Sequence, residues 1–415
     1  MTIFDIMAVL LGLSAVFGFI NHRFLHLPHT IGLVIIALVS SGAVVLMDLA
    51  LPELGIARTA TAVLTQIDFH ETVMNGMLSV LLFAGAVHVN FGELAERRWV
   101  IGLLATVGLL ISTVLVGTAM WLIIAVFGEP IPFIWALVLG ALISPTDPVA
   151  VLGILKTITI PASLKAKIAG ESLFNDGVGV VVFTILLAIA VGGDHGNVGV
   201  GDVARLFLVE AGGGAVLGIA AGYLAYIAMR SIDEHNLEVL ITLALVLCTY
   251  SIALHLHISG PIAVVIAGLF IGNHGARFAM SEKTRNHVFQ FWEISDEILN
   301  SVLFLLIGLE VLVVSLRPDV VSAALLAIPI VLAARWISVA IPITALKFGG
   351  QFSDGAITIL TWGGLRGGIS VALALSLPDN VYKAPILTIT YAVVVFSIIF
   401  QGLTMKALVG RFIKE

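Results

Sequence analysis

The sequence predicts an all-α polytopic membrane protein with about 13 transmembrane helices. First, 60% of the 415 residues are hydrophobic and only 11% are charged, whereas a soluble domain is about 25% charged. Second, the mean hydropathy is +1.13. Third, apolar runs of about 20 residues, the length that crosses a bilayer, alternate with short polar loops. The composition therefore indicates a lipid-embedded protein and excludes a nucleic-acid-binding protein.

The apolar runs define the crossings one by one. The first run carries Asp5 and has no Lys or Arg before it, so it lacks the basic start of a signal peptide and is expected to be retained. The ninth is short and opens with Gly260-Pro261, which makes it marginal. The crossings are expected at 3–20, 30–50, 72–90, 99–127, 133–155, 164–191, 203–230, 237–256, 259–275, 289–314, 319–347, 355–377 and 384–410.

The Lys and Arg residues predict the orientation, because loops on the cytoplasmic side of a membrane carry the excess of positive charge. With the N-terminus outside and the C-terminus in the cytoplasm, the inner loops hold thirteen basic residues and the outer loops four. We expect a location in the cell membrane of a bacterium or archaeon. The inner set is Arg23, Arg97, Arg98, Lys156, Lys165, Lys167, Arg230, Arg277, Lys283, Arg285, Lys347, Arg411 and Lys414, and the outer set is Arg58, Arg205, Arg317 and Lys383.

Two crossings carry sequence that interrupts a helix. Pro145 and Pro148 each remove a backbone donor from the fifth crossing, and the Gly-rich stretch 363–368 loosens the twelfth. The two interruptions are seven crossings apart, and an odd offset means opposite orientations in the membrane. Paired broken helices in two halves of a chain indicate a transporter with its binding site at the breaks.

The domain organisation follows from this pairing. We expect inverted repeats at about 3–191 and 237–410, linked by the helix 203–230, within a single transporter unit covering residues 1–415. The last crossing ends about five residues before the end of the sequence, so we expect no soluble regulatory domain and no ATP-driven pump.

Acidic residues lie inside these crossings, where each charge costs roughly 2.5–3.5 kcal/mol unless it is paired or hydrated. Ser172 and Asp176 are four residues apart and share a helix face, and Thr146 and Asp147 come from the broken fifth crossing. Together they would form an all-oxygen site of the kind that hard cations prefer. A carboxylate there can hold a proton or a sodium ion, and this competition is the minimal requirement for exchange.

Glu171 points roughly 140° away from Asp176 around the helix and needs another partner. Arg335, in the middle of the eleventh crossing, is the favoured partner, and the pair would be structural because arginine keeps its proton. Arg366, at the second helix break, is the alternative partner, or it stabilises the ends of the broken helices.

Other polar and aromatic residues give weaker indications of function, and their expected positions are those of ordinary membrane-protein residues. Cys248, the single cysteine, excludes an intramolecular disulfide and is expected to be a small core residue. Trp99, Trp121 and Trp135 are expected to face the lipid interface. Glu293, Asp296, Glu297 and Asn300 open the tenth crossing, where we expect an interfacial face.

Four strings in the chain resemble the NhaP-type sodium/proton antiporters of the cation:proton antiporter superfamily, and the resemblance runs from about residue 5 to residue 410. These strings are Ser-Pro-Thr-Asp-Pro-Val-Ala-Val at 144–151, Gly-Glu-Ser-Leu-Phe-Asn-Asp-Gly at 170–177, Phe-Trp-Glu at 291–293 and Gly-Leu-Arg-Gly at 364–367.

The resemblance implies roles for particular residues. Asp176 matches the family's ion-binding aspartate, with Thr146, Asp147 and Ser172 as surrounding ligands for Na⁺. Asn175 before Asp176 is similar to the Asn-Asp pair of members that exchange one proton for one cation. Glu171 and Arg335 match the family's buried salt bridge, and Arg366 is a further supporting residue.

The resemblance also implies an NhaA-like antiporter fold, a homodimer, an elevator motion of a core domain against a dimerisation domain, a role in pH homeostasis and no cofactor other than the transported Na⁺ and H⁺. The sequence departs from the family at one place. Many members have Leu-Leu-Phe-Glu on the third crossing, where this chain has Ala84 in place of the acid.

The leading hypothesis is therefore electroneutral exchange of Na⁺ or Li⁺ for H⁺, without enzymatic activity. Ala84 leaves K⁺/H⁺ exchange open as an alternative. An ion channel is the alternative from another class, although no repeated carbonyl filter is visible. A sodium-coupled importer of an organic solute would need an anion site, for which only Arg366 is available.

Overall fold

The structure is a computed structural model that describes residues 3–51, 55, 61, 69–127, 130–147, 151, 162–192, 200–312, 318–346 and 355–412. Within these ranges the chain is helical and forms no strand. Nine of the described helices are long and apolar enough to cross a membrane. These observations confirm the predicted all-α membrane fold class. Helices suit a membrane because each one satisfies its backbone hydrogen bonds within the segment that crosses the lipid.

Several of the described helices are interrupted or flanked by a π-helical turn, labelled η, while η6 is a 3-10 turn. The elements are α1 (Ile3–Ile20), η1 (Asn21–Leu25), α2 (His29–Ala50), η3 (Glu71–Met77), α4 (Leu78–Val87), α5 (Phe91–Glu96), α6 (Arg98–Leu103), η4 (Leu104–Gly108), α7 (Leu109–Phe127), α8 (Phe133–Ile143), α10 (Ala162–Gly192), α11 (Val200–Arg230), α12 (His235–His255), α13 (Gly260–Phe270), η5 (Ile271–Gly275), α14 (Ala276–Phe278), α15 (Glu282–Leu309), η6 (Glu310–Leu312), α16 (Pro318–Leu346), α17 (Ala356–Trp362), α18 (Gly368–Leu375), α19 (Lys383–Phe396), η8 (Ser397–Gln401) and α20 (Gly402–Phe412).

Most helix bounds agree with the predicted crossings to within a few residues, but the tenth begins earlier than expected. The apolar run predicts a start at 289, whereas α15 begins at Glu282. Ser281 caps this end, because its hydroxyl accepts a hydrogen bond from the Thr284 amide at 3.3 Å. The hydroxyls of Ser281 and Thr284 both donate to Asp233, and these bonds hold the pKa of that carboxyl below its ordinary value. A polar cap therefore extends the helix beyond its apolar part.

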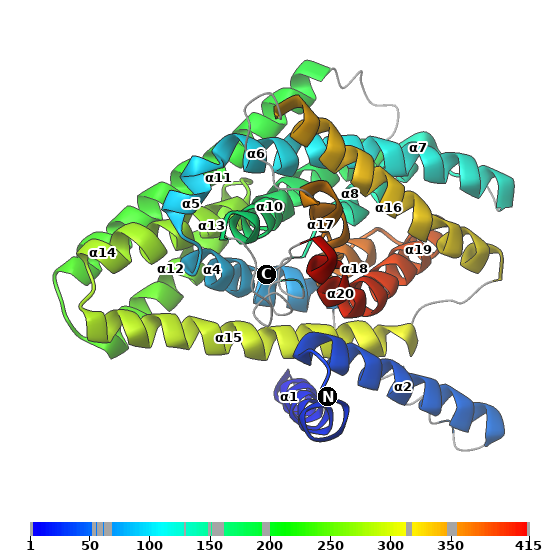
Figure 1. Ribbon diagram of the computed structural model, residues 1–415, viewed down its shortest axis with the longest axis horizontal. Helices are drawn as coiled ribbons and strands as arrows, with labels where there is room; N and C mark the ends of the chain where they lie inside the picture. The colour runs from blue at the N-terminus through cyan, green and yellow to red at the C-terminus, as the bar shows by residue number, and fades with distance from the viewer. Residues whose placement is uncertain are drawn as a thin grey trace.

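The helices pack as two bundles. The α15 bundle contains α1, α2, α4, α11, α12, α13 and α15, and the α10 bundle contains α7, α8, α10, α16, α17, α18 and α19. In Figure 1 α15 runs across the molecule, with α1 and α2 on one side and α10, α17 and α18 on the other. The bundles meet where α10 packs on α11 and α13, and where α18 packs on η3 and α15. The residues of both interrupted crossings belong to the α10 bundle.

Two single-residue expectations are wrong. Trp135 is only 6% exposed and packs against Tyr382 with ring centroids 5.3 Å apart, so it is part of the core, while Trp99 and Trp121 are exposed as expected. Cys248 is exposed on the outer face of α12 and is not a core residue. An apolar sequence cannot distinguish a helix face toward lipid from one toward protein, because both are apolar.

Small residues allow α7 and α8 to approach closely. A Cβ atom added at Gly140 would lie 2.2 Å from the carbonyl oxygen of Thr113, and one added at Gly117 would lie 2.9 Å from that of Ala136. Close backbone approach over small residues is a common way for membrane helices to associate. This contact fixes α8, which carries the first helix interruption at its end.

We expect Gly140→Ala to destabilise the protein by about 1–3 kcal/mol, because the clash is with backbone that has to move. The measurement is the thermal unfolding midpoint of purified protein in detergent. Gly42→Ala in α2 is the matched control, since a Cβ there meets nothing within 4 Å. Equal midpoints for the two variants would show that the α7–α8 contact is not tightly packed.

Candidate cation-binding site

The two interrupted helices meet at their breaks. Helix α8 ends at Ile143 because Pro145 has no amide hydrogen to continue it, and residues 144–147 run on without helical structure. Pro148 lies outside the described residues. Helices α17 and α18 are separated by 363–367. The amide of Asp147 donates to the carbonyl of Leu365 at 2.8 Å, so the two breaks are joined directly through their backbones.

Gly367 is required at this crossing. A Cβ atom there would lie 2.1 Å from Oδ2 of Asp147, which leaves no room for a side chain. The glycine-rich string therefore does more than loosen the helix, because it lets the Asp147 carboxylate lie against the backbone of the other break.

Asp147 and Asp176 line one cavity of about 1270 Å³. Asp176 comes from the middle of α10 and is 4% exposed, and it lies close enough to Asp147 for the two carboxylates to interact electrostatically. Two carboxylates facing one cavity inside a membrane bundle attract a cation, because ionised carboxylates accept and cannot donate hydrogen bonds.

Three further predicted residues form a hydrogen-bonded group next to these carboxylates. The hydroxyls of Thr146 and Ser172 are 2.9 Å apart, and the Asn175 amide nitrogen donates to the Thr146 hydroxyl at 2.8 Å. The Thr146 amide donates back to the Asn175 side-chain oxygen at 3.3 Å. All three residues are buried. This group fixes the broken end of α8 onto α10 and so positions Asp147 and Asp176 relative to each other.

Arg366 fills the space left at the end of α8. It is 2% exposed, and its guanidinium donates to the carbonyls of Ser144 and Pro145 at 2.7 and 3.0 Å. These carbonyls lie where the helix would have continued. A positive charge at a helix C-terminus is favourable, because the free carbonyls carry partial negative charge. Arg366 therefore serves the second of the roles considered for it and is not the partner of Glu171.

The partner of Glu171 is Arg335. The two side chains form a bidentate pair, with Nη1–Oε1 and Nη2–Oε2 distances of 2.5 and 3.0 Å, and Nη2 also donates to the carbonyl of Leu360 at 3.1 Å. Both side chains are almost fully buried. The pair ties α10 to α16 and to α17, on the side of α10 that faces away from the cavity.

Two polar side chains that the sequence did not single out bind the backbone at the second break. The Ser397 hydroxyl accepts from the amide of Arg366 at 2.9 Å, and the Gln401 amide donates to the carbonyl of Trp362 at 3.1 Å. Both belong to the π-helical turn η8, and both bind backbone groups left free by the second break. Such turns occur often at functional sites. The signal available in the sequence was the polar pair Ser397 and Gln401, four residues apart in the mostly apolar thirteenth crossing.

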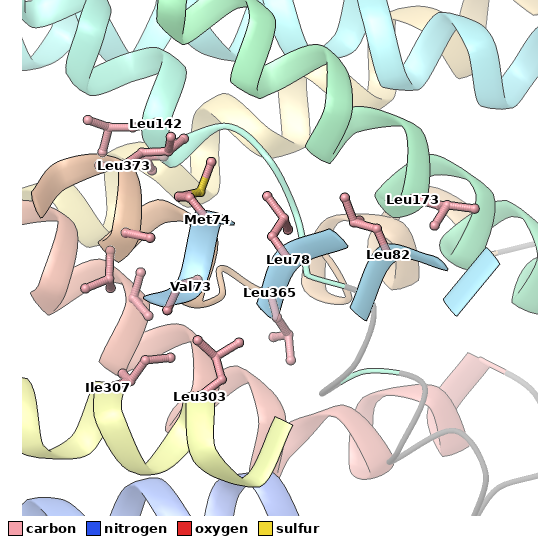
Figure 2. Close-up of a cluster of buried hydrophobic side chains, with 14 of the residues drawn as sticks. Val73, Met74, Leu78, Leu82, Leu142, Leu173, Leu303, Ile307, Leu365 and Leu373 are labelled. Atoms are coloured by element: carbon pink, nitrogen blue, oxygen red, sulfur yellow. The ribbon is translucent and has the colours of Figure 1, made fainter. Parts of the chain in front are cut away.

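The cavity has a charged end and an apolar end. Its lining on α15 runs from Glu293, Asp296 and Glu297 through Asn300 to Leu303, and on the neighbouring α4 and η3 it runs from His88 to Val73. Apolar side chains close the second end. Figure 2 shows Val73, Met74 and Leu78 of η3 and α4 beside Leu303 and Ile307 of α15, with Leu365 from the second break among them.

Three acids of the tenth crossing therefore lie on the cavity wall, where the sequence predicts only an interfacial face. The charged end also includes Glu93, Lys165 and Lys406. On α4 the wall contains Ala84, which is 1% exposed, so this position contributes no acid to the cavity.

Known proteins resemble this chain over nearly its whole length. The family model described as the transmembrane sodium/hydrogen exchanger matches residues 11–411. This chain belongs to the sodium/hydrogen exchanger family. It is 47% identical over 412 residues to the Na⁺/H⁺ antiporter NhaP of Pseudomonas aeruginosa, with 98% of this chain and 96% of that protein covered. The Na⁺/H⁺ antiporter NhaH of Halobacillus dabanensis is 37% identical, with 92% of each chain covered.

The fold of this exchanger-family chain is also found in a solved structure. The sodium proton antiporter MjNhaP1 of Methanocaldococcus jannaschii at pH 8 superposes with a TM-score of 0.77 and 18% identity, covering 99% of both chains. The expected resemblance to NhaP-type proteins is thereby confirmed, and so is the expected antiporter fold.

Proposed function

We propose that this protein exchanges Na⁺ or Li⁺ for H⁺ across the membrane, with the cation and the proton competing for Asp176. The observation that carries the proposal is the pair of carboxylates, Asp147 and Asp176, lining one cavity at the crossing of two interrupted helices. The relatives named above, NhaP and NhaH, are described as Na⁺/H⁺ antiporters and match along almost all of their length.

The ion ligands proposed for Na⁺ are the oxygens of Asp176, Asp147, Thr146 and Ser172. Asn175 holds Thr146 in place through two hydrogen bonds. All of these are oxygen or amide groups, which suit a hard alkali cation. The transported ions are the only ligands the mechanism requires.

The charge balance of the site supports one-for-one exchange. Glu171, Asp147 and Asp176 are acidic and Arg335 and Arg366 are basic, so these five groups carry one negative charge in excess. One sodium ion or one proton neutralises that charge. Because the site is equally neutral in both loaded states, either state can cross the low-dielectric interior, and the exchange is electroneutral.

The division of the helices into two bundles supports a proposal of alternating access. We propose that the α10 bundle, which carries the ion site, slides against the α15 bundle as an elevator. The apolar contact of η3 and α15 with α18 then closes one side of the site while the charged cavity opens on the other. Lys165 and Lys406 lie at the open end, and we propose that this end faces the cytoplasm, in keeping with the excess of basic residues on that side. We also propose that the chain is built from the two inverted repeats expected at about 3–191 and 237–410, and that it forms a homodimer.

The test uses everted membrane vesicles that carry a pH-sensitive dye. After a proton gradient is imposed, we expect added Na⁺ or Li⁺ to dissipate it in vesicles that contain this protein and not in vesicles from cells lacking it. Exchange that does not respond to the membrane potential would support electroneutrality. If neither ion dissipates the gradient, the proposal is wrong.

Potassium exchange is the second candidate, and the apolar wall at Ala84 is the observation that favours it. The same vesicles with K⁺ in place of Na⁺ decide between the two. A channel would instead give single-channel currents in planar bilayers, where an exchanger gives none.

A further inference from the structure

Asn300 on α15 is a buried polar side chain with no partner in the described part of the chain. It is 3% exposed, and neither its Nδ2 nor its Oδ1 makes a hydrogen bond to a described residue. It lies on the wall of the cavity that also contains Asp147 and Asp176. A buried amide without a partner is costly, since it has given up its hydrogen bonds to water.

Contacts one helical turn from Asn300 connect the α15 wall to the second helix break. One turn further along α15, Leu303 lies against Gly368, where an added Cβ would be 2.4 Å from Leu303 Cδ1. The preceding Gly367 lies in the same way against the Asp147 carboxylate. Asn300 therefore lies on the α15 wall of the cavity that Asp147 lines, one helical turn from the residue that contacts the second helix break.

Asn300 is also the last polar residue of α15 before the cavity closes. The acids Glu293, Asp296 and Glu297 line the cavity nearer its charged end, and the next lining residue beyond Asn300 is Leu303. On the neighbouring helix the wall at this depth is apolar, with Leu78, Leu81 and Leu82. An ion that moves from the charged end toward Asp176 thus meets an uncharged amide as the final polar group of the α15 bundle.

We propose that Asn300 is a cation-selecting residue, whose side-chain oxygen takes a ligand position on the alkali cation from the α15 wall while Asp147 and Asp176 bind it from the opposite bundle. Amide oxygens are good ligands for hard cations and do not change charge with pH. The amide replaces part of the hydration shell that the ion sheds on entry. Because it adds an uncharged ligand, it tunes affinity and the preference among Li⁺, Na⁺ and K⁺ without altering the charge balance. This inference rests on the proposed exchange function.

The experiment measures exchange in proteoliposomes as a function of Na⁺, Li⁺ and K⁺ concentration for Asn300→Leu, which keeps the shape of the side chain and removes its oxygen. We expect the apparent KM for Na⁺ to rise about tenfold, with the maximal rate within about twofold of the unchanged protein. The order of preference among the three ions should become flatter. Ser295→Ala is the matched control, because Ser295 lies on the same helix and its hydroxyl donates to the carbonyl of Phe291 within that helix.

The variant is expected to fold, since an apolar group replaces a polar group that has no partner. Asn300→Asp, which keeps size and adds a charge, should lower the apparent KM for Na⁺ at alkaline pH and make it depend more steeply on pH. An unchanged KM in either variant, or a fall in maximal rate at constant KM, would overturn the inference. Absence of exchange in the unchanged protein would instead reject the proposed function.

Discussion

Replacing Asp176 by Asn should abolish exchange, with a loss of at least about 100-fold in rate at any Na⁺ concentration. The amide keeps the size of the side chain but has no negative charge and no titratable proton. Both halves of the proposed cycle are therefore lost, since the cation loses its central ligand and the proton has no acceptor. The measurement is dissipation of a proton gradient by Na⁺ in everted vesicles, with the amount of protein matched between samples.

Asp379→Asn is the matched control for this substitution. Asp379 is an exposed acid that pairs with Lys383 at 2.8 Å in a loop away from the cavity, and its loss should leave exchange unchanged. In the unchanged protein, competition for one site also predicts that the apparent KM for Na⁺ rises as the pH falls. Retained exchange in Asp176→Asn, or a KM independent of pH, would show that another group carries the proton.

Replacing Glu171 by Gln should cause a large loss of stability, about 3–5 kcal/mol, because it leaves the Arg335 guanidinium buried without a counter-charge. The carbonyl of Leu360 accepts one of its hydrogen bonds but does not balance its charge. Since the pair links α10 to α16 and α17, the variant should also lose the fixed geometry around Asp176. The thermal midpoint in detergent and the yield of monodisperse protein measure the effect.

Two further variants separate the buried pair from a general effect of removing charge. Glu96→Gln removes an exposed acid that lies 4.0 Å from Arg97, and it should change stability by no more than about 1 kcal/mol. The double variant Glu171→Gln with Arg335→Met should recover part of the stability lost in the single variant, because no buried charge is left unpaired. A double variant as unstable as the sum of the two single variants would argue against a direct pair.

Much of the architecture could be predicted because membrane crossing imposes strong local constraints. Length and hydropathy set the crossings, so α10 and α16 lie within two residues of the predicted bounds 164–191 and 319–347. The prolines and glycines predict both interruptions, because they remove a donor or a helix-stabilising side chain wherever they stand. The start of α15 was missed because it depends on a polar cap and not on hydropathy.

The sequence by itself thus determined the fold class, the two helix breaks and the small set of acidic residues whose charges are energetically unfavourable inside a membrane. Only the tertiary structure decided which charges meet. Glu171 and Arg335 are 164 residues apart, and Arg366 stood as the alternative partner until the geometry placed its guanidinium on the carbonyls of the first break. The place of Asn300 on the cavity wall was decided in the same way. Spacing along one helix fixes the face on which a side chain lies, but its partner comes from another helix, and only the packing of the two bundles brings them together.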